Sequence, residues 1–322
     1  MSDDARWMAE ALALGEQARG STAPNPNVGC VIVKDGQVLG RGATQPGGRP
    51  HAEAVALAEA GEAAAGATAY VTLEPCCHVS ARGPACADLL IAAGVNQVVA
   101  ALQDPSPRVN GGGFAQLQAC DMAVAIGTGA AQAERSMIGF LTQQRLGRPY
   151  ITLKLAMSID GRIALPSGES RWITGEEARA DVHAIRAQAD MILVGRGTYE
   201  ADAPRLDVRL PGLEHLSPRR AMLTRGAAPG GWHRLREPEA VYGLDGVNEL
   251  LVEGGAGAAA SFLRADLVDR LLVYRAPILI GDGRAGVGDL GLVSLGDAHG
   301  RWARFETRPL GTDILEVYER HR

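Results

Sequence analysis

His51, Glu53, Cys76 and Cys86 are the residues of this chain whose types and spacing could carry out chemistry. Histidine and cysteine are preferred ligands of Zn²⁺, and a catalytic zinc site keeps three protein ligands and leaves a fourth position open to water. The metal lowers the pKa of that water to about 7, so that a nucleophile is available at neutral pH. A glutamate two residues after the histidine could carry protons. The set indicates zinc-dependent deamination, whose signature is H-x-E followed by P-C-x-x-C.

The two cysteines stand further apart than in that signature. Nine residues separate Cys76 from Cys86, and they form a loop that carries His78 and Arg82. A loop rising from a metal site could hold an anionic group of a substrate with these two side chains. Cys77 is the alternative to Cys76 as a ligand, and as a fourth ligand it would close a purely structural zinc site. We predict Cys76, because it directly follows a Glu-Pro pair.

The start of a helix is the element that the H-x-E motif requires. In the middle of a helix His51 and Glu53 would lie on nearly opposite faces, so we predict them at the beginning of a helix over 51–60, which Pro50 precedes. The positive end of that helix would favour an anionic nucleophile.

The remainder of the first half alternates strands and helices, which predicts an α/β layered domain. In this pattern Cys76 leaves the end of a strand and Cys86 begins a helix. Helices are expected over 3–19, 85–93, 114–119 and 130–145, and strands over 28–33, 37–40, 67–73, 97–102 and 122–126.

The tripeptide Gly147-Arg148-Pro149 is predicted to be a linker, because a fresh α/β pattern follows it. The 322 residues are therefore predicted to form two domains, 1–147 and 148–322. A strand over 249–252 should enter the glycine-rich turn 253–257 and then a helix, an arrangement whose backbone N–H groups could bind a pyrophosphate. Further strands are expected over 151–157, 191–194, 268–274 and 314–318, a helix over 175–189, and irregular structure over 203–248.

Composition narrows the class of protein. The chain is 46% hydrophobic and 21% charged, as in ordinary globular proteins, and its net charge of −5 argues against broad nucleic-acid binding. The N-terminus lacks the apolar region of a secretory signal, and no apolar stretch approaches the ~20 residues of a membrane span. Five cysteines, an odd number, do not form a disulfide framework, so we expect a reducing, cytoplasmic setting without a membrane partner.

Several segments resemble the bifunctional deaminase–reductase family of riboflavin biosynthesis. They are residues 24–33, 51–53, 70–76 and 103–105 and, in the second half, 154–162 and 167–174. The resemblance implies a cytidine-deaminase-like three-layer α/β/α domain followed by a dihydrofolate-reductase-like α/β domain. The first would remove the 2-amino group of 2,5-diamino-6-(5-phosphoribosylamino)pyrimidin-4-one. The second would use NADPH to reduce the ribosyl group of the product to a ribityl group.

The resemblance also implies roles for individual residues of this chain. Glu53 would be the catalytic proton carrier beside Zn²⁺, Asn25 would contact the base, and His78 and Arg82 would face the ribose-phosphate. In the second half the substrate would contact Ser170, Arg186, Leu206, Arg209 and Glu253. NADPH would contact Ala156, Trp172, Thr198, Asp202, Thr224, Gly254, Gly255 and Ala256.

The chain departs from the family pattern in places. The family usually has eight residues between its two cysteines, a spacing that Cys77 would satisfy. It tends to have Asn at Ser106 and Thr at Asp207, and residues 210–248 are short for a region expected to hold part of the adenosine-phosphate pocket.

Two other functions compete with the bifunctional enzyme. One is a nucleic-acid deaminase with an appended domain, against which the long cysteine loop and the acidic balance count. The other is a metal-stabilised module that binds nucleotide without turnover. We expect the enzyme, acting on a small-molecule pyrimidine ribotide and not on nucleic acid, as a homodimer or higher homo-oligomer.

Overall fold

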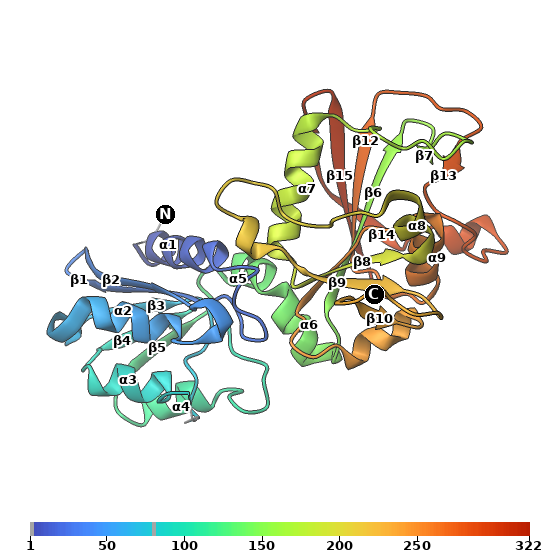
Figure 1. The fold of residues 1–322 in the computed structure, drawn as a ribbon. Coiled ribbons are helices and arrows are strands. Elements are labelled where there is room, and N and C mark those ends of the chain that lie inside the picture. Colours follow the sequence, from blue (N-terminus) through green and yellow to red (C-terminus); the bar gives the residue numbers. More distant parts are fainter. Residues whose placement is uncertain (1–2, 79–81) are drawn as a thin grey trace. The chain divides into compact units, whose positions relative to one another are not determined.

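Two large mixed sheets organise the chain, one in each of two units, Met1–Gly147 and Arg148–Arg322. The structure is a computed structural model that describes residues 3–78 and 82–322. Figure 1 shows the ribbon with its helices and strands labelled. In the described part of the chain, no helix combines the length and the apolar character that crossing a membrane requires.

The sheet of the first unit has the order β2-β1-β3-β4-β5, in which β1 is antiparallel to both neighbours and β3, β4 and β5 are parallel. Its strands are β1 (Gly29–Lys34), β2 (Gln37–Ala43), β3 (Thr68–Val71), β4 (Gln97–Ala100) and β5 (Ala123–Ile126). The helices are α1 (Asp3–Gln17), α2 (Ala52–Ala60), α3 (Cys86–Ala92), α4 (Gly112–Gln118), α5 (Ala130–Ser136) and α6 (Ile138–Leu146). Figure 1 shows α1 on one face of this sheet and α2 and α3 on the other, so the unit has three layers.

Helix α2 packs against β2 at two glycines. A Cβ at Gly42 would lie 2.1 Å from the carbonyl oxygen of Ala52, and one at Gly40 would lie 2.1 Å from that of Ala56. Only glycine allows the backbones of the helix and the strand to approach so closely. Since His51 immediately precedes this helix, the packing at the two glycines fixes where its imidazole lies.

The sheet of the second unit has the order β10-β9-β8-β11-β6-β12-β15-β14. Its first six strands are parallel, and β15 and β14 extend it by antiparallel pairing. The strands are β6 (Tyr150–Ser158), β8 (Met191–Gly195), β9 (Arg219–Leu223), β10 (His233–Leu235), β11 (Glu249–Val252), β12 (Arg270–Ala276), β14 (Trp302–Leu310) and β15 (Asp313–Arg320). A separate pair joins β7 (Arg162–Ala164) to β13 (Arg284–Ala285), and the helices are α7 (Glu176–Gln188), α8 (Arg196–Asp202) and α9 (Ala256–Arg264).

Most of the expected elements are confirmed, two expectations are wrong, and β7, α8, β13 and β14 were not expected. The single helix expected over 130–145 is two helices, because Met137 has φ −105° and ψ 19°, outside the helical range. The stretch 203–248, expected to be irregular, contains β9 and β10. Strand β14 was not expected, because most of its side chains are exposed and leave no apolar alternation in the sequence.

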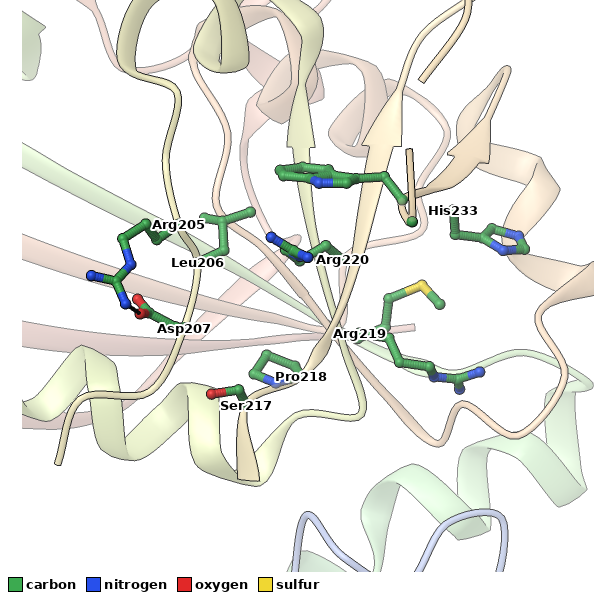
Figure 2. Close-up of a pocket in the computed structure, with 11 residues that line it drawn as sticks. Arg205, Leu206, Asp207, Ser217, Pro218, Arg219, Arg220 and His233 are labelled. Carbon is green, nitrogen blue, oxygen red and sulfur yellow. Dashed lines mark ion pairs between the residues drawn. The ribbon is translucent and has the colours of Figure 1, made fainter. Parts of the chain in front are cut away.

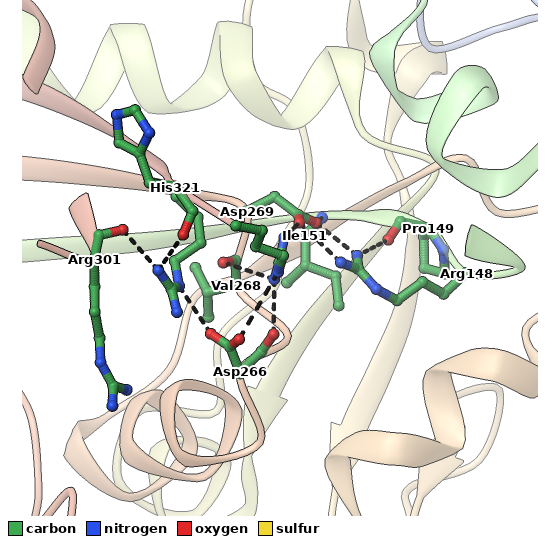
Figure 3. Close-up of polar contacts among 10 residues, drawn as sticks. Arg148, Pro149, Ile151, Asp266, Val268, Asp269, Arg301 and His321 are labelled. Atoms are coloured by element: carbon green, nitrogen blue, oxygen red, sulfur yellow. Dashed lines mark hydrogen bonds and ion pairs between the residues drawn. The ribbon is translucent and has the colours of Figure 1, made fainter. Parts of the chain in front are cut away.

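A buried ion pair holds together the beginning and the end of the second unit (Figure 3). Arg148 donates two hydrogen bonds to the carboxylate of Asp269, at 2.7 and 2.9 Å, and the two side chains are only 3% and 5% exposed. The backbone N–H of Ile151 donates to the same carboxylate at 2.8 Å, and Arg322 also pairs with it. Asp269 therefore connects Arg148 of the linker, the beginning of β6 at Ile151 and the C-terminal residue Arg322.

We predict that Asp269→Asn destabilises the second unit by about 3–5 kcal/mol, because it leaves the buried Arg148 without its counter-charge. Urea unfolding followed by tryptophan fluorescence measures this, since three of the four tryptophans lie in the second unit. Glu306→Gln is the matched control, because Glu306 and Arg308 form a 3.4 Å pair whose side chains are each 44% exposed. It should cost about 0–1 kcal/mol, and equal losses in the two variants would contradict the prediction.

Candidate functional sites

Three potential metal ligands from three segments of the first unit lie together. His51 directly precedes α2, Cys76 follows the end of β3, and Cys86 is the first residue of α3. Their ligand atoms all lie within 4.8 Å of one another, and no other group of this kind occurs among residues 3–78 and 82–322. The helix starts and the strand end predicted from the sequence therefore meet at one point.

The distances within this group fit a tetrahedral zinc ion. His51 Nδ1 lies 3.3 Å from Cys86 Sγ and 3.6 Å from Cys76 Sγ. A tetrahedral ion with ordinary Zn–S and Zn–N bond lengths would separate nitrogen and sulfur by about 3.6 Å. Both thiols are buried, and the backbone N–H of Cys86 donates to Cys76 Sγ at 3.3 Å. A hydrogen bond from the Cys86 thiol lowers the pKa of Cys76, which favours the thiolate that a metal requires.

Glu53 is a buried carboxylate beside the three ligands. It lies in the first turn of α2, and its side chain is 3% exposed. Burial raises the pKa of Glu53, while the charge of His51 and a hydrogen bond with Cys86 act in the opposite direction. A carboxyl group whose pKa is raised takes up a proton more readily than an ordinary one and can both accept and donate it. Glu53 is thus positioned and tuned for general acid–base chemistry.

Cys77 is directed away from the three ligands. Its thiol contacts the backbone oxygen of Arg108 at 3.7 Å, and it does not belong to the group that His51 forms with Cys76 and Cys86. The four-ligand structural site considered from the sequence is therefore not assembled here. The other two cysteines lie where the sequence places them, with Cys30 fully buried in the core and Cys120 exposed.

Asn25, His78 and Arg82 are the residues expected to contact the substrate of the first unit. The Asn25 amide donates to the carbonyl of Gly48 at 2.7 Å and lies 3.4 Å from Nε2 of His51. Arg82 donates to the carbonyl of Gly47 at 2.6 Å. His78 keeps a buried Nδ1 that has no hydrogen-bond partner among the described residues. The part of the expected substrate loop over 79–81 lies outside the described residues.

Glu74 is a residue whose role could not be predicted from the sequence motif. Its buried carboxylate accepts hydrogen bonds from the backbone N–H groups of Asp104, Gly111, Gly113 and Phe114, at 2.8–3.2 Å. It thereby shapes the 104–114 loop next to Cys76. Burial raises the pKa of Asp104 in that loop to about 6. A glutamate between a strand and a cysteine ligand is the signal that could have pointed to this role.

In the second unit, the residues expected to bind the cofactor gather at the carboxyl ends of the parallel strands. Ala156 lies near the end of β6, Thr198 follows β8, Thr224 follows β9, and Gly254 follows β11. This edge of an open parallel sheet is where nucleotides bind in α/β proteins. Asp202 ends α8, and its backbone carbonyl accepts a hydrogen bond from Arg171 at 2.8 Å.

The glycine-rich turn leads directly into α9. The N–H of Gly255 donates to the Thr198 hydroxyl at 2.8 Å, and Ala256 begins the helix. A Cβ at Gly254 would lie 2.7 Å from the Cβ of Ala258, so the close packing of the turn on its own helix already requires this glycine. The helix N-terminus, and not the presence of glycine, is therefore the feature suited to a pyrophosphate.

A buried charged triad faces the same end of the sheet. Arg186 of α7 donates to both carboxylate oxygens of Glu253, at 2.7 and 2.9 Å, and Lys154 of β6 lies 3.8 Å from that carboxylate. Burial would raise the pKa of Glu253, but Lys154 and Arg186 outweigh it and hold the pKa below its ordinary value. Burial lowers the pKa of Lys154. Lys154 was missed as a site residue, although a lysine within an apolar strand was visible in the sequence.

The other expected substrate residues of this unit surround the triad less tightly. Arg186 also donates to the backbone carbonyl of Asp207 at 3.1 Å, and the N–H of Arg209 donates to His183 at 3.3 Å. The Leu206 side chain is buried in the core. Trp172 is 65% exposed under the guanidinium of Arg179, and Ser170 lies two residues before it in the segment between β7 and α7.

Comparisons with family models agree with this division of the chain. Residues 1–102 match the cytidine and deoxycytidylate deaminase zinc-binding region, and residues 149–229 and 235–315 match the RibD C-terminal domain. The fold and the three-ligand group thus define a zinc-binding deaminase domain of the cytidine deaminase type, followed by a dihydrofolate-reductase-like domain.

Relatives and solved structures match nearly the whole chain. The riboflavin biosynthesis protein RibD of Escherichia coli (strain K12) is 42% identical over 360 residues, which cover 97% of this chain and 98% of that protein. The structure of Acinetobacter baumannii RibD, form 1, matches with a TM-score of 0.91 and 37% identity, covering 99% of each chain. A deaminase/reductase structure from Thermotoga maritima matches with a TM-score of 0.91 and 27% identity over 99% of each chain.

The chain belongs to the RibD family and is a bifunctional deaminase and reductase of riboflavin biosynthesis. The aligned length of 360 residues exceeds the 322 residues of this chain, so the Escherichia coli relative carries segments that this chain lacks.

We predict that Cys76→Ser and Cys86→Ser abolish zinc binding, because each removes one of the three converging ligands. Cys77→Ser should retain the zinc, since that thiol points elsewhere and provides a matched control from the adjacent position. Zinc content measured by mass spectrometry after exhaustive dialysis distinguishes the variants. Loss of zinc in Cys77→Ser together with its retention in Cys76→Ser would reverse the assignment.

Proposed function

We propose that the first unit hydrolytically removes the 2-amino group of 2,5-diamino-6-(5-phosphoribosylamino)pyrimidin-4-one. The second unit would then use NADPH to reduce the ribosyl group, giving 5-amino-6-(5-phosphoribitylamino)uracil. The observation that carries the proposal is the group of His51, Cys76 and Cys86 with the buried Glu53 beside it. The solved relative from Thermotoga maritima is described as a deaminase and reductase of such phosphoribosylaminopyrimidines, which supports the same substrate here.

The first reaction depends on the transfer of protons by Glu53. Zn²⁺ on His51, Cys76 and Cys86 would supply an activated water at neutral pH. The Glu53 carboxylate would accept a proton from the water that attacks the amine-bearing ring carbon. The resulting carboxylic acid, favoured by burial, returns protons to the ring nitrogen and to the departing ammonia. Asn25, beside His51, would orient the pyrimidine, and His78 and Arg82 would face its ribose-phosphate.

The second reaction needs a hydride and a proton. The bound nicotinamide would supply the hydride to C1′ of the sugar. The C1′–O4′ bond breaks, and the ring oxygen takes up a proton to become a hydroxyl group. We assign that proton to Lys154, a buried amine whose pKa is lowered, which makes it a better acid than an exposed lysine. Glu253, itself held by Arg186, pairs with the amine, and Arg209 and Ser170 would contact the sugar phosphate.

The choice of NADPH is supported by charge at the end of β9. The guanidinium of Arg196 donates to the Thr224 hydroxyl at 2.8 Å and pairs with Glu200 at 3.2 Å, so a cation lies at the strand end where the adenosine ribose would lie. A 2′-phosphate would meet this charge, whereas NADH carries none there. The pyrophosphate would lie at the N-terminus of α9, next to Gly254, Gly255 and Ala256. Trp172, Thr198, Asp202 and Ala156 would contact the nicotinamide half of the cofactor.

We predict that Glu53→Gln and Lys154→Met separate the two reactions. Glu53→Gln should slow deamination by about 10²–10⁴-fold because the proton carrier is lost, while reduction of the deaminated intermediate continues. Lys154→Met should do the reverse. Each purified variant would be incubated with the diamino ribotide or the deaminated ribotide, with and without NADPH, and the products followed by mass spectrometry.

The wild type provides the reference for both variants. It should lose the amine without NADPH and gain two hydrogens only when NADPH is added. Its reduction should also decline with rising pH at a lower pH than an ordinary lysine would give, because the protonated amine is needed and its pKa is lowered. An active Glu53→Gln deaminase, or an active Lys154→Met reductase, would refute the corresponding assignment.

We further propose that the enzyme is a homo-oligomer, in the cytoplasm. Strand β14 is at one end of its sheet, with Phe305 exposed on it, and such an edge can pair with a second copy. Free cysteines are consistent with a reducing compartment. Sedimentation equilibrium of the wild type and of Phe305→Lys tests the assembly. The variant should dissociate, and a wild type that is monomeric at all concentrations would contradict it.

A further inference from the structure

A cavity of about 760 Å³ lies over β9 and β10, and Leu206 is the one lining residue that is also expected to contact the substrate of the second unit. One wall is the segment 205–207, and the other walls come from the two strands and the residues that precede them (Figure 2). Its lining residues are Met191, Arg205, Leu206, Asp207, Ser217, Pro218, Arg219, Arg220, Gly231, Trp232 and His233. The volume falls within the range of pockets that bind small molecules.

The cavity carries an excess of positive charge. Its lining contains three arginines and a histidine but a single acid, Asp207. The Asp207 carboxylate lies 2.8 Å from Arg205 and 3.5 Å from Arg209, so its charge is already matched. The guanidinium of Arg219 is fixed by the backbone carbonyls of the turn at 245–246. Arg220 is the lining arginine for which no oxygen partner occurs among the described residues.

Arg220 is held in place without an acidic partner. Its guanidinium carbon lies 5.4 Å from the centre of the Trp232 ring, and Tyr199 packs edge-on against that ring at 5.3 Å. Among the described residues, no carboxylate or carbonyl oxygen pairs with this guanidinium. A guanidinium stacked on an aromatic ring keeps its in-plane N–H groups available, and their fork matches two oxygens of a phosphate. Figure 2 shows Arg220 extending toward the segment with Arg205 and Asp207.

The position of the cavity separates it from the substrate site. The Asp207 backbone carbonyl accepts from Arg186, whereas the Asp207 side chain is directed to Arg205. Of the residues expected to contact the substrate, Leu206 lines the cavity, whereas Ser170, Arg186, Arg209 and Glu253 do not. Pro218 and the buried Leu206 give it an apolar surface between the charged side chains.

We propose that this cavity binds a phosphorylated small molecule of about mononucleotide size. Its phosphate would be held between Arg220 and Arg205, and its uncharged body would lie over Leu206 and Pro218. The charge asymmetry, the pre-positioned guanidinium and the apolar surface together define this class of ligand. Because the cavity is open to solvent, binding should weaken as salt screens the arginine.

Equilibrium titration of the full-length protein with uridine 5′-monophosphate tests the proposal, with heat of binding as the readout and uridine as the uncharged control. The wild type should bind the nucleotide saturably and uridine far more weakly. Arg220→Met should weaken binding about tenfold or more, since a hydrogen-bonded charge on phosphate is lost. Arg234→Met is the matched control, because Arg234 is exposed on the neighbouring strand and does not line the cavity. It should leave the affinity unchanged.

A third variant separates this cavity from the substrate site. Arg186→Met should retain nucleotide binding, because Arg186 is outside the cavity. No turnover is measured, so an inactive deaminase or reductase would not affect the result. Thermal unfolding of each variant confirms that it is folded, and Arg220→Lys replaces Arg220→Met if the latter is not. A wild type that does not bind, equal affinity in the Arg220 variant, or loss in Arg186→Met would each overturn the proposal.

Discussion

The first unit depends on one constraint, the distance at which two thiols and an imidazole must converge on a metal. His51 Nδ1 lies 3.3 and 3.6 Å from the two sulfur atoms, although the three residues come from the start of α2, the end of β3 and the start of α3. The glycines of β2 allow α2 to pack close to the sheet. Glu74 accepts a hydrogen bond from the backbone of Asp104 and so connects the loop that follows β4 to the segment with Cys76. A shift of about 1 Å in any of these contacts would separate ligands from metal, which explains why the packing around the site is so close.

Buried charge serves two different purposes in the second unit. Around Asp269 two arginines and the backbone N–H of Ile151 surround the carboxylate at the amino end of β12, and its role is structural. Around Glu253 one carboxylate likewise meets two cations, Arg186 and Lys154, but at the carboxyl end of the sheet. Burial, together with the positive charge of Arg186, lowers the pKa of Lys154. The protonated amine is therefore a stronger acid than that of an ordinary lysine, at the edge of the sheet where ligands bind.

Residues 203–248 differ from the expected secondary structure and also form much of the cavity over β9 and β10. Residues 203–248 were expected to be irregular, yet β9 and β10 extend the parallel sheet by two strands. These strands are short and begin with exposed basic residues, so neither their length nor their hydrophobicity marks them in the sequence. Arg219, Arg220 and His233 of these strands line the cavity, where Asp207 pairs with Arg205 and Arg209.

Local sequence determined the features that depend on neighbouring residues alone. His51 and Glu53 could be placed at a helix start because their spacing is incompatible with a helix interior, and the turn before α9 was evident from its glycines. Only the tertiary structure decided what depends on distant segments. It distinguished Cys76 from Cys77, because the direction of each thiol is set by α3 and by the loop at Arg108. It also revealed the burial of Lys154, since a side chain becomes buried and its pKa shifts only when residues far away in the chain pack around it.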